Sequence, residues 1–154
     1  MISFGSGEKK AKAGRFGTLA RSKLLKMVTS TKETGKRGED IAADYLKNKG
    51  YRILQRNYIP SWFKQGRKEI DIVVQKGGLL VFVEVKTGHR IYDFVPEDHI
   101  DYKKQRFLAQ AGESYLLEKN IPEKTEWQID VVSVILDRNN QVSKISHFEN
   151  VIGE

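Results

Sequence analysis

Two carboxylates that face each other across a predicted β-hairpin are the most chemically suggestive feature of this 154-residue sequence. The dipeptide Gly77-Gly78 separates two runs rich in β-branched and apolar residues, which is typical of a hairpin with a two-residue turn. With these glycines as the turn, the numbers of paired residues add up to 155, so Asp71 lies directly opposite Glu84. Like charges in such positions, with Cβ atoms roughly 5 Å apart, destabilise a sheet. The pair therefore needs a cation or a shared proton.

A hard divalent cation, Mg²⁺ or Mn²⁺, is the compensation that two such carboxylates favour. Lys86 lies two residues after Glu84 and so on the same face of the strand, where it could orient a water molecule or neutralise charge on a phosphate. Glu69 lies opposite Lys86 and is a candidate to position the metal ligands without binding the ion itself. The alternative is a solvent-exposed face of mixed charge, with Glu69 and Lys86 as a surface pair. A slip of one residue in register would move every one of these side chains to the other face.

Glu39 is a charged residue within the apolar stripe of a predicted helix over residues 38–49. At 100° per residue it lies among Ala42, Ala43 and Leu46, where a carboxylate costs several kcal/mol unless something compensates it. This position favours Glu39 as a further ligand. The alternative is that Glu39 lies in the first turn of the helix, where a negative charge is favoured and solvated.

Lys104 lies on the apolar side of a second predicted helix, between Ile100 and Leu108. Either its aliphatic chain passes along the core to place the ammonium group in water, or it points toward the same sheet face and contacts phosphate. Asp130 interrupts an otherwise apolar strand without an evident partner, and we expect it to be structural. We expect all three histidines at the surface: His89, His99 and His147.

The elements that would position these residues predict one mixed sheet with helices packed on it, an α/β domain. The predicted order is helix, three strands, helix and two strands, over residues 38–49, 51–58, 69–75, 79–87, 100–118, 127–136 and 142–148. A loop over residues 60–66 carries two aromatic residues that we expect to be exposed, Trp62 and Phe63.

Basic residues are concentrated near the N-terminus. Residues 1–37 carry a net charge of +8, whereas residues 38–154 carry −1. We expect residues 1–33 to form a basic, flexible arm and residues 34–154 to form the folded domain. The arm is either a solvated tail or an electrostatic contact to a phosphate backbone. An organelle transit peptide is a third alternative.

The composition also excludes several classes of protein. The chain has no cysteine, which rules out disulfide scaffolds, thiolate metal sites and cysteine nucleophiles. No apolar run approaches the roughly 18 residues that a membrane helix needs, so we expect no membrane partner. No secretory segment is evident, and a cytoplasmic location is expected.

The motifs form an ordered set along the chain: Gly35-Lys36-Arg37-Gly38-Glu39-Asp40-Ile41-Ala42, Gly50-Tyr51-Arg52-Ile53-Leu54, Arg56-Asn57-Tyr58, Glu69-Ile70-Asp71-Ile72-Val73, Phe82-Val83-Glu84-Val85-Lys86-Thr87, Lys104-Gln105-Arg106 and His147-Phe148-Glu149-Asn150. This set resembles the YraN-like bacterial proteins. Their fold is that of the restriction-endonuclease-like nucleases, related to Holliday-junction resolvases.

The resemblance implies a divalent-metal-dependent nuclease with Mg²⁺ or Mn²⁺ as its cofactor. In that pattern Asp71, Glu84 and the backbone carbonyl of Val85 hold the ion, Glu39 binds it through water or holds a second ion, and Lys86 positions the attacking water. The implied partner is nucleic acid, with DNA favoured over RNA. Resolvase-like relatives work as dimers, so a homodimer is left open. We expect four basic residues to contact the nucleic acid: Lys68, Lys103, Lys104 and Arg106.

Three positions depart from the family pattern. Lys68 stands where the family usually has Gly, the loop over residues 60–67 is longer, and Gly88 replaces a basic residue. None of these removes a candidate ligand. Two other functions stay open. One is a nucleic-acid-binding or adaptor protein that keeps the nuclease fold without catalysis, and the other is a protein-interaction domain with a charged surface.

Overall fold

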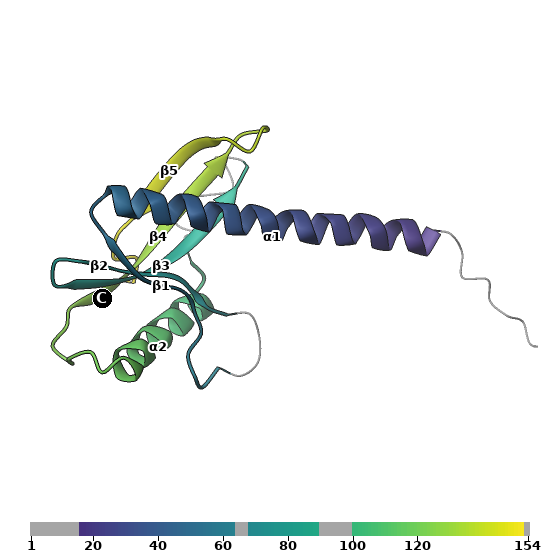
Figure 1. Ribbon diagram of the computed structural model, residues 1–154. Helices are drawn as coiled ribbons and strands as arrows, with labels where there is room; N and C mark the ends of the chain where they lie inside the picture. Colours follow the sequence, from purple (N-terminus) through teal and green to yellow (C-terminus); the bar gives the residue numbers. More distant parts are fainter. Residues whose placement is uncertain (1–15, 64–67, 90–99, 153–154) are drawn as a thin grey trace, which may run out of the picture. The chain divides into compact units, whose positions relative to one another are not determined.

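A computed structural model describes residues 16–63, 68–89 and 100–152, with the backbone alone for residues 16–30. The helices and strands follow the predicted order (Figure 1): α1 (Phe16–Asn48), β1 (Arg52–Tyr58), β2 (Ile70–Lys76), β3 (Leu79–Gly88), α2 (Tyr102–Glu118), β4 (Trp127–Leu136) and β5 (Val142–Phe148). The predicted α/β class and the order of the elements are therefore confirmed. None of the helices in the described ranges is long and apolar enough to cross a membrane.

The chain divides into two compact units, Met1–Glu33 and Thr34–Glu154. Helix α1 begins at Phe16, so residues 16–33, which we expected to be flexible, are helical. Residues 1–15 lie outside the described residues.

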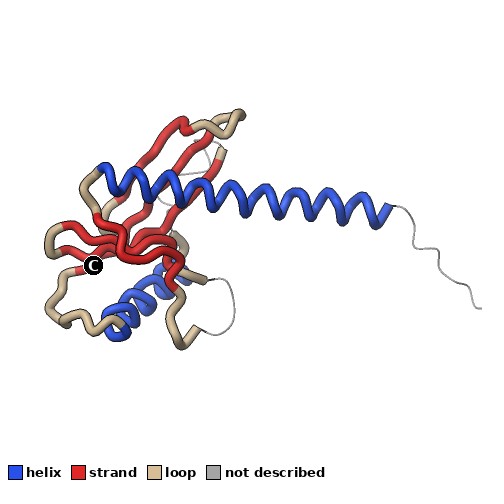
Figure 2. Tube along the Cα trace, in the orientation of Figure 1, coloured by secondary structure: helices blue, strands red, loops and turns tan. Residues whose placement is uncertain are grey.

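The five strands form one mixed sheet in the order β1-β2-β3-β4-β5 (Figure 2). The pair β3–β4 is parallel, and every other neighbouring pair is antiparallel. Helix α2 lies in the connection between β3 and β4, as parallel neighbours require. Nearly every residue of β4 is buried, which explains its almost uninterrupted apolar sequence.

The register of the β2–β3 hairpin is the one that its two-residue turn predicts. The pairs run from Lys76–Leu79 to Ile72–Val83, and each pair of numbers adds up to 155. Gly77 has a φ of 59°, a left-handed conformation that glycine adopts without steric cost. Asp71 and Glu84 are therefore brought to the open end of this hairpin, one step beyond the last pair.

The sheet is covered on both faces, and each face has its own apolar cluster. Helix α2 contributes Phe107 and Leu108 to a cluster with Phe82 of β3, whereas the C-terminal part of α1 contributes Leu46 to a cluster with Val132 of β4. The C-terminal part of α1 and helix α2 lie on opposite sides of the sheet (Figure 1). Both faces therefore have a core, and each helix can deliver a polar side chain to the sheet's margin.

Helix α1 lies close against β3 at Gly38. A Cβ atom at this position would overlap Oγ1 of Thr87 on β3, so only glycine fits there without movement. Gly35, one turn earlier, has nothing within 4 Å of such a Cβ. The close approach at Gly38 brings the next residue, Glu39, to the sheet.

Candidate active site

Asp71 marks the point where the pairing of β2 with β3 ends. Its Oδ2 accepts a hydrogen bond of 2.6 Å from the backbone N–H of Val85. The side chain thus takes a place that a backbone carbonyl would hold in a continuing ladder, and it is fixed against β3. Val85 makes this contact through its N–H, while the role predicted for its carbonyl stays a prediction.

The environment of Asp71 favours the protonated carboxyl in the absence of a cation. Burial is the largest cause and the charge of Glu84 the second, and together they raise the pKa of Asp71 to about 8. Glu39 raises this pKa further, whereas the N–H of Val85 and the charge of Lys104 lower it. A bound cation would remove the same excess of negative charge.

Glu84 is buried on β3 and is flanked by two lysines. Lys104 Nζ lies 2.9 Å from Oε2, and Lys86 Nζ lies 3.6 Å from Oε1. The Lys104 contact is an ion pair by distance, but its angles are not those of a hydrogen bond, and the buried Oε2 accepts none from any described residue. Glu84 Oε2 is therefore paired by charge alone.

Lys104 points toward the sheet rather than into water. Its ammonium group donates a hydrogen bond of 3.4 Å to the carbonyl of Glu69, in addition to its ion pair with Glu84. Asp101 caps the first turn of α2, accepting a hydrogen bond of 2.8 Å from the backbone N–H of Lys104. The cap sets the start of the helix and with it the position of Lys104.

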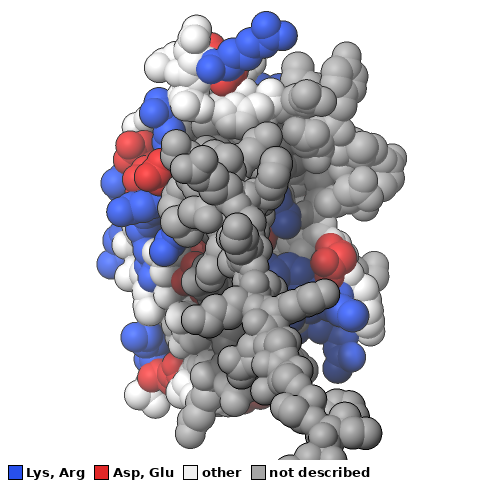
Figure 3. All heavy atoms as spheres, turned by 90° about the vertical axis from the view of Figure 1, so that its right-hand side faces the viewer, with Lys and Arg blue, Asp and Glu red and all other residues white. Residues whose placement is uncertain are grey.

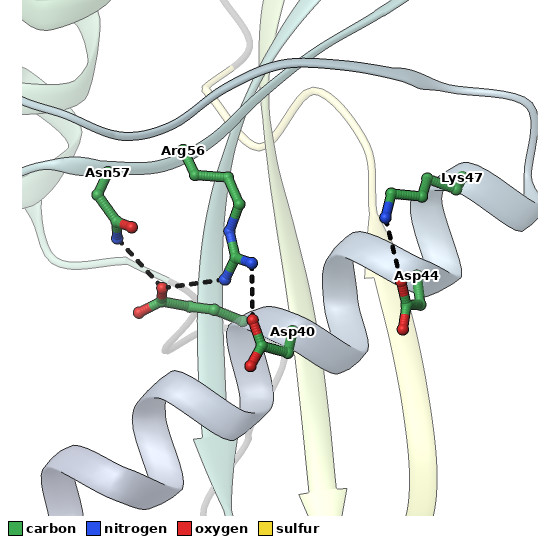
Figure 4. Close-up of polar contacts among 6 residues, drawn as sticks. Asp40, Asp44, Lys47, Arg56 and Asn57 are labelled. Atoms are coloured by element: carbon green, nitrogen blue, oxygen red, sulfur yellow. Dashed lines mark hydrogen bonds and ion pairs between the residues drawn. The ribbon is translucent and has the colours of Figure 1, made fainter.

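Glu39 is held by two residues of β1. Its Oε2 accepts a hydrogen bond of 3.1 Å from Asn57 Nδ2 and lies 3.6 Å from Arg56 Nη2. Arg56 also contacts Asp40 Oδ1 at 2.6 Å (Figure 4). Because α1 begins at Phe16, Glu39 lies deep inside the helix, and the alternative of a solvated first turn is wrong.

Three carboxylates gather where α1 meets β2. One oxygen from each of Glu39, Glu69 and Asp71 lies within 4.8 Å of the others. Glu69 thus faces the acidic cluster, and the surface pair with Lys86 considered above is not formed, since Lys86 contacts Glu84. Glu84 lies outside this trio but acts on Asp71 through its charge. A donor set made only of carboxylate oxygens fits Mg²⁺ or Mn²⁺.

The basic residues expected to contact nucleic acid lie on or near α2. Lys68 Nζ and Lys104 Nζ lie 6.0 Å and 5.7 Å from the centre of the Phe107 ring. Lys103 and Arg106 are exposed on α2. The face in Figure 3 carries Lys and Arg side chains interspersed with Asp and Glu, so its described part is of mixed charge.

A second polar cluster was missed from the sequence. Asp130, fully buried, accepts hydrogen bonds from Gln128 Nε2 at 2.8 Å and from the N–H of Asn150 at 2.9 Å, and its Oδ2 lies 2.8 Å from His147 Nε2. The side chain of His147 is only 10% exposed, so its predicted surface position is wrong. The feature that brings the two residues together is the pairing of β4 with β5, which places the motif that begins at His147 beside Asp130. His89 is exposed, and His99 lies outside the described residues.

The family model described as "Uncharacterised protein family UPF0102" matches residues 38–134. A UPF0102 protein of Persephonella marina is 40% identical over 114 residues, covering 73% of this chain and 90% of the relative. UPF0102 proteins of Dictyoglomus thermophilum and Chloroherpeton thalassium are each 36% identical, over 113 and 107 residues, covering 73% and 70% of this chain and 91% and 78% of the relatives. These matches confirm the predicted YraN-like family: the chain belongs to the protein family UPF0102.

Proposed function

We propose that this protein is a divalent-metal-dependent nuclease that hydrolyses phosphodiester bonds of nucleic acid, with structured or branched DNA as the favoured substrate. The observation that carries the proposal is the pair Asp71 and Glu84 at the open end of a hairpin. Glu84 is buried and Asp71 is partly buried, the charge of Glu84 acts on Asp71, and Glu39 and Glu69 add two further carboxylates beside Asp71. Such an arrangement is costly for the fold without a cation.

Asp71, Glu84 and Glu39 would hold the ion, with Glu69 in support. The ion would supply Lewis-acid stabilisation of charge on the phosphate and lower the pKa of a bound water. The chain's own groups do the positioning. The Val85 N–H fixes the Asp71 carboxylate.

Lys86 is the residue best placed to orient the attacking water or to contact the phosphate. Its ammonium group lies 3.6 Å from Glu84 Oε1 while its side chain stays partly exposed, so it reaches both the carboxylates and solvent. Lys104, closer to Glu84 and less exposed, positions that carboxylate.

A second candidate function is a nucleic-acid-binding or adaptor protein that keeps the fold without catalysis. The ion pair of Glu84 with Lys104 favours this candidate, because it already neutralises one buried carboxylate without a metal ion. In that case binding would not depend on Mg²⁺.

Cleavage assays separate the two functions. Linear duplex, single-stranded and branched DNA and the corresponding RNAs are incubated with the protein in Mg²⁺, in Mn²⁺ or in EDTA. We expect metal-dependent cleavage that falls by about 100-fold or more in Asp71→Asn, Glu84→Gln and Lys86→Ala. The matched control is Asp44→Asn, an exposed acid on α1 that pairs with Lys47.

Equal cleavage by native protein and all three site variants would overturn the nuclease proposal, as would the absence of cleavage of every substrate. Metal-independent binding without cleavage would support the adaptor function instead.

A further inference from the structure

Trp62 is a large aromatic residue that is held firmly at the surface. Its side chain lies in the connection between β1 and β2 and is 48% exposed. The indole Nε1–H nevertheless donates a hydrogen bond of 2.6 Å to Ser114 Oγ on α2. The ring also makes edge contacts with Phe63 and Phe107, at centroid distances of 5.7 Å and 6.3 Å. Trp62 therefore has few conformations to lose when something binds to it.

The backbone next to Trp62 is tied to the same helix. Glu118 accepts a hydrogen bond from the backbone N–H of Ser61 and another from the hydroxyl of Tyr58, each 2.9 Å long. These bonds anchor the start of the connection to the C-terminal end of α2. An anchored aromatic platform binds a planar ligand at a smaller entropic cost than a mobile one.

Beside Trp62 lies an open surface pocket of about 380 Å³, within the size range of ligand clefts, roughly 300–1,000 Å³. Trp62 and Leu117, which is 79% exposed, supply its apolar lining. Gln110, Glu113 and Ser114 supply its polar lining. We call this open pocket the Trp62 pocket. A planar aromatic ligand with hydrogen-bonding groups on its rim matches this combination of walls.

Phe107 links Trp62 to the lysines of the candidate active site. The Phe107 ring contacts Trp62 and lies near the ammonium groups of Lys68 and Lys104, and Lys104 pairs with Glu84. Along the chain, the connection that carries Trp62 leads into β2, whose second residue is Asp71. The ammonium groups of these lysines thus lie between Trp62 and the carboxylates. A nucleic-acid strand bound at both places would have its phosphates near them.

We propose that the Trp62 pocket receives an unpaired base, so that the substrate class is nucleic acid with unpaired bases next to the bond that is cut. This inference rests on the proposed nuclease function. Every base has a π face that stacks on an aromatic side chain, and the neighbouring lysines favour a polyanion over an apolar protein segment. A base inside a duplex is stacked on its neighbours and does not reach the pocket.

The polar rim adds a preference among bases. The Glu113 carboxylate accepts hydrogen bonds only, and the Gln110 amide offers an acceptor as well as donors. Adenine, cytosine and guanine carry exocyclic amino donors, which thymine lacks. An exocyclic amino group on the bound base would find an acceptor at this rim.

Tryptophan fluorescence tests the inference at the residue itself. The chain has two tryptophans, so a Trp127→Phe protein reports on Trp62 alone. It is titrated in EDTA, where no metal-dependent cleavage occurs, with a short unstructured single strand and with the same sequence as a blunt duplex. We expect the single strand to quench Trp62 emission and the duplex not to quench it.

Affinity is measured in parallel with fluorescently labelled strands. Trp62→Ala should bind the single strand roughly 5- to 150-fold more weakly, the loss expected for one base–aromatic stack, with little change for duplex. Tyr102→Ala is the control: it removes an exposed aromatic residue at the start of α2, outside the Trp62 pocket, and should change neither affinity. Glu113→Gln should narrow the difference between adenine-rich and thymine-rich strands.

Unchanged emission from native Trp62 would overturn the inference even if Trp62→Ala did not fold. Equal quenching by duplex would also overturn it, as would a dimer in sedimentation that Trp62→Ala converts to monomer, because a second copy would then cover the pocket. These binding measurements need no turnover. Quenching without cleavage would therefore contradict the nuclease proposal and support the base pocket. Cleavage of single-stranded and duplex DNA that is unchanged in Trp62→Ala would support the nuclease proposal and contradict the base pocket.

Discussion

Lys104 on α2 and Glu84 on β3 form an ion pair with 2.9 Å between Nζ and Oε2, and the two side chains are 21% and 8% exposed. This contact joins the helix to the middle strand of the sheet at the edge of the core. It also makes Lys104 a counter-charge of this buried carboxylate.

Removing this counter-charge should destabilise the fold. Lys104→Met leaves Glu84 buried with only Lys86, 3.6 Å away, and should lower the free energy of unfolding by about 2–3 kcal/mol in urea titrations. Lys103→Met, at an exposed neighbouring position, is the control. Adding Glu84→Gln to Lys104→Met should restore part of the loss, and equal stability of the single and double variants would contradict the role of the pair.

The stability of the metal-free protein should fall as pH rises from about 4 to about 8. Asp71 has a folded pKa of about 8, above its ordinary value of 3.8, so across this window the folded protein keeps a proton that the unfolded chain has released. The free energy of unfolding then decreases by at most about 1.4 kcal/mol per pH unit, and the contribution is lost as pH passes the folded pKa.

Urea unfolding in EDTA at several pH values measures this slope. The Asp71→Asn protein lacks this titrating group, so its free energy of unfolding should change less steeply with pH across the same window. The difference between the two slopes is the contribution of Asp71. Identical slopes for the two proteins would show that Asp71 is ionised in both states.

Divalent cations should stabilise the folded protein. At Mg²⁺ concentrations about 100 times the dissociation constant, the free energy of unfolding should rise by about 2.7 kcal/mol, because the folded state alone binds the ion. Thermal unfolding with and without Mg²⁺ measures this effect. It should disappear in Asp71→Asn and persist in Asp44→Asn, and a gain of equal size in both variants would mean that the ion binds elsewhere.

Two glycines of α1, Gly35 and Gly38, should respond to alanine in opposite directions. Gly38→Ala places a methyl group against Thr87 and should cost about 1–3 kcal/mol, whereas Gly35→Ala meets no neighbour and should stabilise the helix by up to about 1 kcal/mol. Thermal unfolding of the two variants compares them directly. If Gly38→Ala behaved like Gly35→Ala, the contact between α1 and β3 would be looser than it is here.

The basic N-terminal segment should strengthen binding to nucleic acid without reading its sequence. Removal of residues 1–31 should weaken binding about equally across sequences and make the plot of log affinity against log salt shallower, by about one unit per lost phosphate contact. Titrations at several salt concentrations measure both effects. An unchanged slope would identify the segment as a solvated tail.

Much of the fold could be predicted because local signals agree with the tertiary structure. The two-residue turn at Gly77-Gly78 sets the register of the β2–β3 hairpin, and this alone brought Asp71 close to Glu84. The start of α1 could not be predicted in the same way. Gly35 and Gly38 interrupt the helical pattern, and Gly38 is there for its close approach to Thr87 rather than to end the helix.

The contacts that complete the site depend on side-chain directions, which spacing does not determine. The sequence left open whether Lys104 reaches water or the sheet, and the structure directs it to Glu84. Asp130 looked unpartnered because His147 lies 17 residues away, and only the β4–β5 pairing places them side by side. The roles of Asp71, Glu84 and Lys86 in catalysis stay predictions.

The ion pair between α2 and β3 also bears on the order in which the chain folds. The β2–β3 hairpin closes over two residues and can form early, zipping from its turn, but its open end carries two carboxylates that repel each other. Lys104 reaches Glu84 only when α2, in the connection between β3 and β4, packs on the sheet and β4 pairs with β3. We therefore expect the carboxylate end of the hairpin to close last, so that the loss of Lys104 accelerates unfolding and leaves the folding rate nearly unchanged.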